Sequence, residues 1–122
     1  MQVVDLMTTD VITVSRETGI RDAARLMFRN RVSGLPVTSP DGSLIGIITE
    51  ADFLRLEVER QDGAHELGET VGEVMSAGVV TTGPDTEVYD AAKMMTFQDI
   101  KRLPVVDEDS RLLGIISRAD IV

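Results

Sequence analysis

The spacing of apolar residues changes in a fixed order along the first half of the chain, and each spacing predicts one kind of element. A short apolar lead-in at residues 4–7 is followed by a run at residues 11–14, which predicts a small strand. A helix is then predicted over residues 19–30, with Thr18 as its N-cap, because its apolar positions follow the i, i+3, i+4, i+7 rule: Ile20, Ala23, Ala24 and Met27.

Two further apolar runs, at residues 35–38 and 43–49, are short and partly β-branched, so they predict strands. The polar turn Pro40-Asp41-Gly42 lies between them and is typical of a hairpin that needs a positive φ at glycine. A second helix is predicted from Thr49 to about residue 60. The order of elements is therefore β-α-β-β-α.

The same plan returns 68 residues later. Residues 5–54 align with 73–122 without a gap, and 18 of the 50 pairs are identical. The second copy predicts a lead-in at 71–75, a strand at 79–82, a helix at 87–98 capped by Thr86, and strands at 103–106 and 111–117 with Asp109-Ser110 in their turn. The fold class is therefore α/β (α+β), with two β-α-β-β-α repeats packed about a pseudo-twofold axis. We expect repeat 1 over residues 1–60, a linker over 61–72 and repeat 2 over 73–122.

The linker is charged and rich in glycine, and it holds the chain's one histidine, His65. We expect His65 to be a solvated surface residue, since a metal site would need further ligands nearby. The second copy stops at Val122, a few residues into its last helix, so we expect either a trimmed piece of a longer protein or a helix that ends as a stub.

Composition narrows the classes of function. The net charge is −9, from 21 acidic and 12 basic residues, which argues against nucleic acid or an anionic membrane as the main partner. The absence of cysteine removes disulfides and thiolate chemistry. No apolar run is long enough to cross a bilayer and no signal peptide is evident, so a cytoplasmic location is expected.

Each copy ends in the same motif, Gly-Ile-Ile-Thr/Ser-x-x-Asp, at Gly46–Asp52 and Gly114–Asp120. Two interpretations remain open. The hydroxyl and the carboxylate can form a capping box that satisfies the first N–H groups of the helix. Alternatively, the helix start can bind a ligand, with the Asp accepting hydrogen bonds from the hydroxyls of a sugar.

Three features present in both halves resemble the CBS domain family, two of whose repeats form a Bateman module. These are the lead-ins Leu6-Met7 and Val74-Met75, the Leu-Pro-Val strands, and the Gly-Ile-Ile-Thr/Ser-x-x-Asp ends. The resemblance covers nearly the whole chain and implies regulation rather than catalysis. It implies an energy-state sensor that binds AMP, ADP or ATP, with S-adenosylmethionine as a second choice, in two clefts between the repeats.

The resemblance also assigns residues to the two clefts. In one cleft Ser117 and Asp120 would take the ribose and Lys101 and Arg102 the phosphates, with a base pocket from Asp10, Ile12, Val32 and Ser33. In the other cleft Thr49 and Asp52 would take the ribose, with a base pocket from Gly78, Val80, Ile100 and Lys101. No cofactor is required for this function.

An enzyme is not expected, since the chain lacks cysteine, has a single histidine and shows no glycine-rich phosphate loop. The alternatives to a ligand sensor are a ligand-free dimerisation scaffold and a regulatory fragment of a larger enzyme or transporter. The sequence names neither the ligand nor the regulated partner.

Two further expectations concern symmetry. Apolar residues off the main helix faces, Leu26 and Phe28 in one copy and Met94 and Phe97 in the other, predict a homodimer, since the resembling family pairs through these helices. The alternative is scattered exposed apolar residues. The dipeptide before Leu-Pro is Lys101-Arg102 in one copy and Ser33-Gly34 in the other. We therefore expect the Asp120 cleft to prefer a phosphorylated nucleotide, unless these cations are merely solvated.

Overall fold

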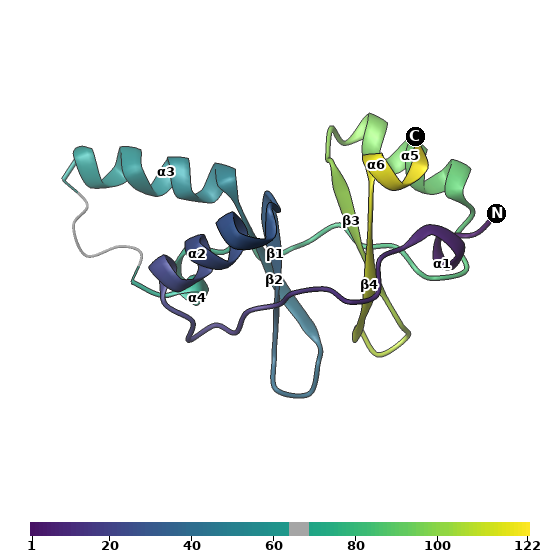
Figure 1. Ribbon diagram of the computed structural model, residues 1–122. Helices are drawn as coiled ribbons and strands as arrows, with labels where there is room; N and C mark the ends of the chain where they lie inside the picture. The colour runs from purple at the N-terminus through teal and green to yellow at the C-terminus, as the bar shows by residue number, and fades with distance from the viewer. Residues whose placement is uncertain (64–68) are drawn as a thin grey trace. The chain divides into compact units, whose positions relative to one another are not determined.

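The computed structural model describes residues 1–63 and 69–122, which form two compact units. Unit 1 contains Met1–Val11 and Val80–Val122, and unit 2 contains Ile12–Val79. Unit 2 holds α2 (Ile20–Asn30), β1 (Gly34–Thr38), β2 (Leu44–Thr49), α3 (Glu50–Gln61) and α4 (Val71–Val74) (Figure 1). Unit 1 holds α1 (Val3–Leu6), α5 (Val88–Phe97), β3 (Arg102–Val106), β4 (Leu112–Ser117) and α6 (Arg118–Ile121). Two β-hairpins, each followed by a helix, confirm the predicted fold class.

The core of unit 2 lies between its hairpin and its helices. β1 and β2 are antiparallel, with Leu35 opposite Ile48 in the register, and both side chains are buried. The i, i+3, i+7 face of α2 and the buried side of α4 complete the cluster. The apolar spacing predicted from the sequence therefore marks three positions of the buried face of α2 correctly, whereas Ala24, the fourth predicted position, is exposed.

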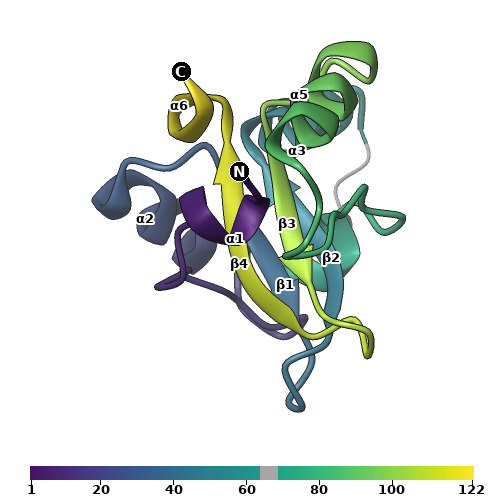
Figure 2. The ribbon, with the colours of Figure 1, turned by 90° about the vertical axis from the view of Figure 1, so that its right-hand side faces the viewer.

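Unit 1 repeats this arrangement. β3 and β4 pair with Leu103 opposite Ile116, and Ala91 and Met95 of α5 are buried against them. Val3 of α1 is fully buried in the same cluster. As Figure 2 shows, β4 runs directly into α6, so the last strand fixes where that helix begins.

Each lead-in packs on the hairpin of the other repeat. Thr8, just after α1, exchanges two backbone hydrogen bonds of 2.9 Å with Ile115 of β4. Ser76, just after α4, makes the equivalent pair with Ile47 of β2 at 2.9 and 3.0 Å. The compact units therefore do not follow the repeat boundaries along the chain, because residues 1–11 join repeat 2.

The glycine of each Gly-Ile-Ile motif makes this crossing possible. A Cβ at Gly46 would lie 2.6 Å from Met75 Sδ and 2.9 Å from the Ser76 carbonyl oxygen. A Cβ at Gly114 would lie 2.6 Å from the Thr8 carbonyl oxygen. Glycine is required here by close approach of two backbones.

The small strands predicted at residues 11–14 and 79–82 were wrong. Only Val14 and Thr82 form single parallel bridges, to Val37 and Val105. The next hydrogen bond of a parallel ladder would need the N–H of Pro36 or Pro104, and proline has none. The prolines of the Leu-Pro-Val strands therefore stop each ladder after one residue.

The predicted N-caps of the first helices were wrong by one residue. Gly19 caps α2 and Glu87 caps α5, in place of Thr18 and Thr86. The Thr18 hydroxyl instead accepts a hydrogen bond from the Ser15 backbone N–H at 3.1 Å. It thus closes the preceding turn.

The hairpin turns agree with the predicted backbone. Gly42 has a φ of 89°, as its turn demands. Ser110, the equivalent residue of the second hairpin, has a φ of 64°, although a side chain disfavours that conformation. The carboxylate of Asp107 compensates by accepting hydrogen bonds from the N–H groups of Asp109 and Arg111 at 2.8 and 2.9 Å.

The four extra apolar residues of the first helices divide into two kinds. Phe28 and Phe97 are exposed, at 86% and 79%, as a free second face requires. Leu26 and Met94 are partly buried and pack against the cores of their own units, so their assignment to a second apolar face was wrong. The linker prediction spans residues outside the described ranges, and His65 is one of them.

Candidate functional site

Thr49 and Asp52 lie where β2 becomes α3. Thr49 occupies the N-cap position, and its backbone N–H donates to Asp52 Oδ2 at 2.8 Å, as in a capping box. The Thr49 hydroxyl donates to the same oxygen at 3.3 Å. The capping interpretation of this motif is therefore correct for unit 2.

The other oxygen of Asp52 is also occupied. The Ser76 hydroxyl donates to Oδ1 at 3.1 Å, and Arg55 Nη2 lies 3.0 Å from the same atom. Asp52 is only 2% exposed, although it carries a charge. Burial of a carboxylate is tolerated here because donors from three residues surround it.

Ser117 and Asp120 occupy the equivalent place in unit 1, where β4 becomes α6. The Ser117 backbone N–H and hydroxyl donate to Asp120 Oδ2 at 2.8 and 3.1 Å. Within the described part of the chain, Asp120 Oδ1 receives no hydrogen bond. Asp120 is half-buried and thus more accessible than Asp52.

The residues before each Leu-Pro lie beside these helix starts. In unit 1 the Lys101 carbonyl accepts the N–H of Arg118 at 3.1 Å, and Arg102 stands opposite Ser117 in the sheet register. In unit 2 the Ser33 carbonyl accepts the N–H of Glu50 at 3.0 Å. The structure thus brings the backbone of Lys101 and Arg102 next to Ser117 and Arg118, at the start of α6.

The remaining predicted site residues are distributed over both units. Unit 1 holds Asp10, Val80 and Ile100, and unit 2 holds Ile12, Val32 and Gly78. Lys101 and Asp10 are exposed, and Ile12, Val80 and Ile100 are partly buried. Gly78 has a φ of 44°, which favours glycine at that position.

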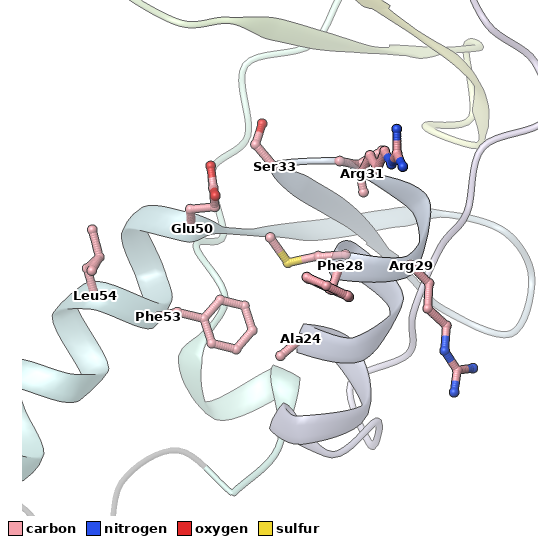
Figure 3. Close-up of a pocket in the computed structure, with 10 residues that line it drawn as sticks. Ala24, Phe28, Arg29, Arg31, Ser33, Glu50, Phe53 and Leu54 are labelled. Carbon is pink, nitrogen blue, oxygen red and sulfur yellow. The ribbon is translucent and has the colours of Figure 1, made fainter.

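Unit 2 also carries a pocket of about 1050 Å³ between α2 and α3. In Figure 3 the ring of Phe53 points from α3 toward Ala24 of α2, and Ser33 and Glu50 stand at the upper end. Val32 and Ser33 line this pocket, whereas Thr49 and Asp52 do not. Exposed Phe28 and Leu54 give it an apolar rim.

Sequence reasoning missed Arg55 and Ser76. A signal for Ser76 existed, since a hydroxyl residue follows the lead-in methionine in both copies, at Thr8 and Ser76. Arg55 lies three residues after Asp52, which places both on one face of α3. Nothing in the sequence showed that the lead-in of one repeat would reach the helix of the other.

In residues 1–63 and 69–122, no group of three or more His, Asp or Glu side chains is placed to hold a metal ion. Over the same described residues, no helix is long and apolar enough to span a membrane.

Comparison with known proteins shows which family shares the two repeats of this chain. The CBS domain model matches residues 3–59 and 71–122. The chain is 38% identical over 118 residues to the CBS domain-containing protein YhcV of Bacillus subtilis, covering 96% of this chain and 80% of that protein. It spans only 22% of a homoserine O-acetyltransferase of Methanohalobium evestigatum, at 34% identity over 96% of this chain.

Solved structures show the same fold. CBSX2 in complex with AMP matches with a TM-score of 0.91 and 32% identity, covering 98% of this chain and 92% of that one. CBSX2 is a CBS-pair protein from Arabidopsis thaliana. The CBS domain pair of MJ0100, in complex with 5′-methylthioadenosine and S-adenosyl-L-methionine, matches with a TM-score of 0.87 and 29% identity, covering 99% of this chain and 92% of that one.

Proposed function

This chain belongs to the CBS domain family, and on that premise we propose that it is a regulatory module that binds an adenosine-containing ligand. AMP, ADP or ATP is the proposed ligand class, with S-adenosylmethionine as the second choice. Relatives with AMP or with S-adenosyl-L-methionine and 5′-methylthioadenosine support the adenosine part of the ligand.

The observation that carries the proposal is the state of Asp120. Its Oδ2 caps α6 through Ser117, while its Oδ1 receives no hydrogen bond within the described residues. A carboxylate accepts several hydrogen bonds, so Asp120 retains capacity for the two hydroxyls of a ribose. Capping and ligand binding therefore need not compete at this residue.

Lys101 and Arg102 would meet the phosphates of the same ligand. Both flank the start of β3, beside Ser117, in a chain whose net charge is −9. Charge-assisted hydrogen bonds to phosphate are roughly twice as strong as neutral ones, and the Arg fork matches two phosphate oxygens. Asp10, Ile12, Val32 and Ser33 are proposed to form the base pocket.

A second, weaker site is proposed on Thr49 and Asp52, with Gly78, Val80, Ile100 and Lys101 around the base. Ser33-Gly34 stands there in place of Lys101-Arg102, so this site lacks the paired cations. It suits a less charged adenosine compound.

The module is proposed to regulate rather than to catalyse. CBS-pair proteins that stand alone are typically non-catalytic, and other relatives carry the pair as a region of an enzyme. A change of energy state, sensed through the nucleotide, would be passed to a partner enzyme or transporter. The localisation that fits this role is cytoplasmic.

Thermal shift and calorimetry with AMP, ADP, ATP and S-adenosylmethionine test the proposal. We expect at least one of them to raise the melting temperature, since a ligand that binds only the folded state stabilises it. A melting temperature that no compound moves at millimolar concentration would leave the scaffold function instead.

We also propose that the chain is a homodimer, and a separate observation favours this. Phe28 and Leu54 line the pocket between α2 and α3 and are exposed at 86 and 70%, and Val58, further along α3, is exposed at 60%. Tyr89 and Phe97 of α5 in unit 1 are exposed at 71 and 79%. Contiguous exposed apolar side chains mark an interaction surface, and a second copy of this chain is the proposed occupant.

A further inference from the structure

The carboxylate of Asp52 has no free capacity for a ligand. An ionised Asp offers about four lone-pair sites. Thr49 fills two of them through its backbone N–H and hydroxyl, Ser76 fills a third, and Arg55 Nη2 forms an ion pair with Oδ1 at 3.0 Å. A ribose hydroxyl can therefore bond Asp52 only after one of these donors has left.

Arg55 is the donor best placed to leave. The Arg55 side chain is 51% exposed, whereas the Asp52 side chain is 3% exposed. The guanidinium can therefore leave Asp52 and be hydrated by solvent. Thr49 belongs to the cap of α3, and its departure would disturb the helix start. Ser76 is fixed through its backbone bridge to Ile47.

Departure of Arg55 also breaks a second contact. The same Nη2 atom donates to the Val74 carbonyl of α4 at 3.1 Å, so the guanidinium ties the start of α3 to α4 within unit 2. The Nε atom of Arg55 also lies 3.9 Å from Glu59 Oε1. A ligand that displaces the guanidinium must therefore offset these three interactions. Because the ligand binds only molecules in which Asp52 is uncovered, its apparent affinity is reduced in proportion to the fraction of such molecules.

We propose that Arg55 is an affinity-setting residue of the Asp52 site, where its guanidinium occupies the carboxylate oxygen that a ribose would need. This inference rests on the proposed adenosine-binding function. If Arg55 acts in this way, the two proposed sites differ for a second reason, besides the presence of Lys101-Arg102 before Leu-Pro in the second repeat only. Among the described residues, Asp120 receives two hydrogen bonds, both on Oδ2, whereas Asp52 receives three and also pairs with the Arg55 guanidinium.

Calorimetry with adenosine tests the inference, because an uncharged probe does not respond to the loss of a nearby cation. Asp120→Ala serves as the background, so that only the Asp52 site reports. Adding Arg55→Ala should strengthen adenosine binding by at least about tenfold, the size expected for removing one charged competitor. Adding Asp52→Ala to that pair should abolish the gain.

Arg25→Ala is the matched control. Arg25 forms an i, i+3 ion pair with Asp22 at 3.2 Å in the same unit, but both side chains are exposed and neither contacts Asp52. In the Asp120→Ala background it should leave adenosine affinity unchanged. If Arg55→Ala does not fold, Ser76→Ala removes another donor to Oδ1 and should also strengthen binding, by about threefold or more.

The outcomes separate the two claims. Suppose that AMP binds the wild-type chain, but that adenosine binds the Asp120→Ala, Arg55→Ala double variant no more tightly than it binds Asp120→Ala alone. The inference is then wrong and the proposed function stands. If no adenosine compound binds the wild type or the Arg55→Ala variants, both are wrong. A gain that survives Asp52→Ala would also overturn the inference, since it would arise elsewhere.

Discussion

At the residue scale, two aspartates with the same motif have different surroundings. Asp52 is buried among donors from Thr49, Ser76 and Arg55, and Asp120 is half-buried with donors from Ser117 alone. The carboxylate of Asp52 therefore contributes more to folding. The capping box was one of the two interpretations that the sequence left open in both copies. Of the further donors around Asp52, Arg55 lies on the same helix face, whereas Ser76 comes from a position that local spacing does not connect to Asp52.

Removing the two carboxylates should cost different amounts of stability. Asp52→Ala loses a charged hydrogen-bond network and a cap, which we expect to lower the free energy of unfolding by about 2 kcal/mol or more. Asp120→Ala loses mainly a cap, at about 1 kcal/mol. Urea denaturation of both variants measures the difference, and equal losses would contradict the description of Asp52.

Thr82 is a buried polar residue whose hydroxyl has no partner in the described part of the chain. It is 6% exposed, and its Oγ1 finds no hydrogen-bond partner in residues 1–63 and 69–122. Its counterpart in the first repeat is Val14, which bridges the neighbouring strand in the same way. Thr82→Val should therefore raise the free energy of unfolding by about 1 kcal/mol, since an unsatisfied hydroxyl is removed.

The mirror-image change provides the control. Val14→Thr places a hydroxyl into the equivalent apolar position and should lower stability by about 1–3 kcal/mol. The stability of the Thr82→Val and Val14→Thr variants is compared through the midpoints of their chemical denaturation curves. A Thr82→Val variant that melts earlier than the wild type would show that the hydroxyl has a partner in solution.

At the scale of elements, the backbone of each lead-in packs against a glycine in the hairpin of the opposite repeat. Sequence periodicity placed α2, α5 and both hairpins correctly, because those patterns are local. It did not place the lead-ins on the opposite hairpins, because those contacts join Thr8 to Ile115 and Ser76 to Ile47, which are 107 and 29 residues apart along the chain. The strands predicted at 11–14 and 79–82 failed because Pro36 and Pro104 lack the N–H that a longer ladder needs.

Alanine at either crossing glycine should destabilise the chain. A methyl group at Gly46 or Gly114 would lie 2.6 Å from its nearest neighbour, which at Gly114 is a backbone oxygen. We expect a loss of about 1–3 kcal/mol, larger at Gly114 because a backbone atom yields less than a Met side chain. Gly83→Ala is the control, since its nearest neighbour is 3.8 Å away. Unchanged melting of Gly114→Ala would refute the close approach.

The hairpin turns separate folding from binding. Gly42→Val forces a β-branched residue to a φ of 89° and should cost about 1 kcal/mol or more. Nucleotide affinity measured well below the melting temperature should stay unchanged, because none of the proposed site residues belongs to the turn. A folded Gly42→Val chain with a large loss of affinity would place the turn in the site.

At the scale of the whole molecule, the exposed aromatic residues of α2 and α5 are the basis of the proposed homodimer. Phe28→Ser should shift the chain toward monomer in light scattering at micromolar concentration, since it removes an exposed apolar anchor. Leu113→Ser, on β4 and 37% exposed, is the control and should leave the mass unchanged. A wild-type chain that is already monomeric at this concentration would contradict the dimer.

The central claim is that the chain binds an adenine nucleotide chiefly through Asp120. Calorimetry with AMP on wild type, Asp120→Ala, Arg102→Ala and Asp52→Ala tests it most directly. We expect Asp120→Ala and Arg102→Ala to lower affinity at least about tenfold, or 1.4 kcal/mol, and Asp52→Ala to change it much less. Two equivalent sites, or a greater loss from Asp52→Ala than from Asp120→Ala, would contradict the claim.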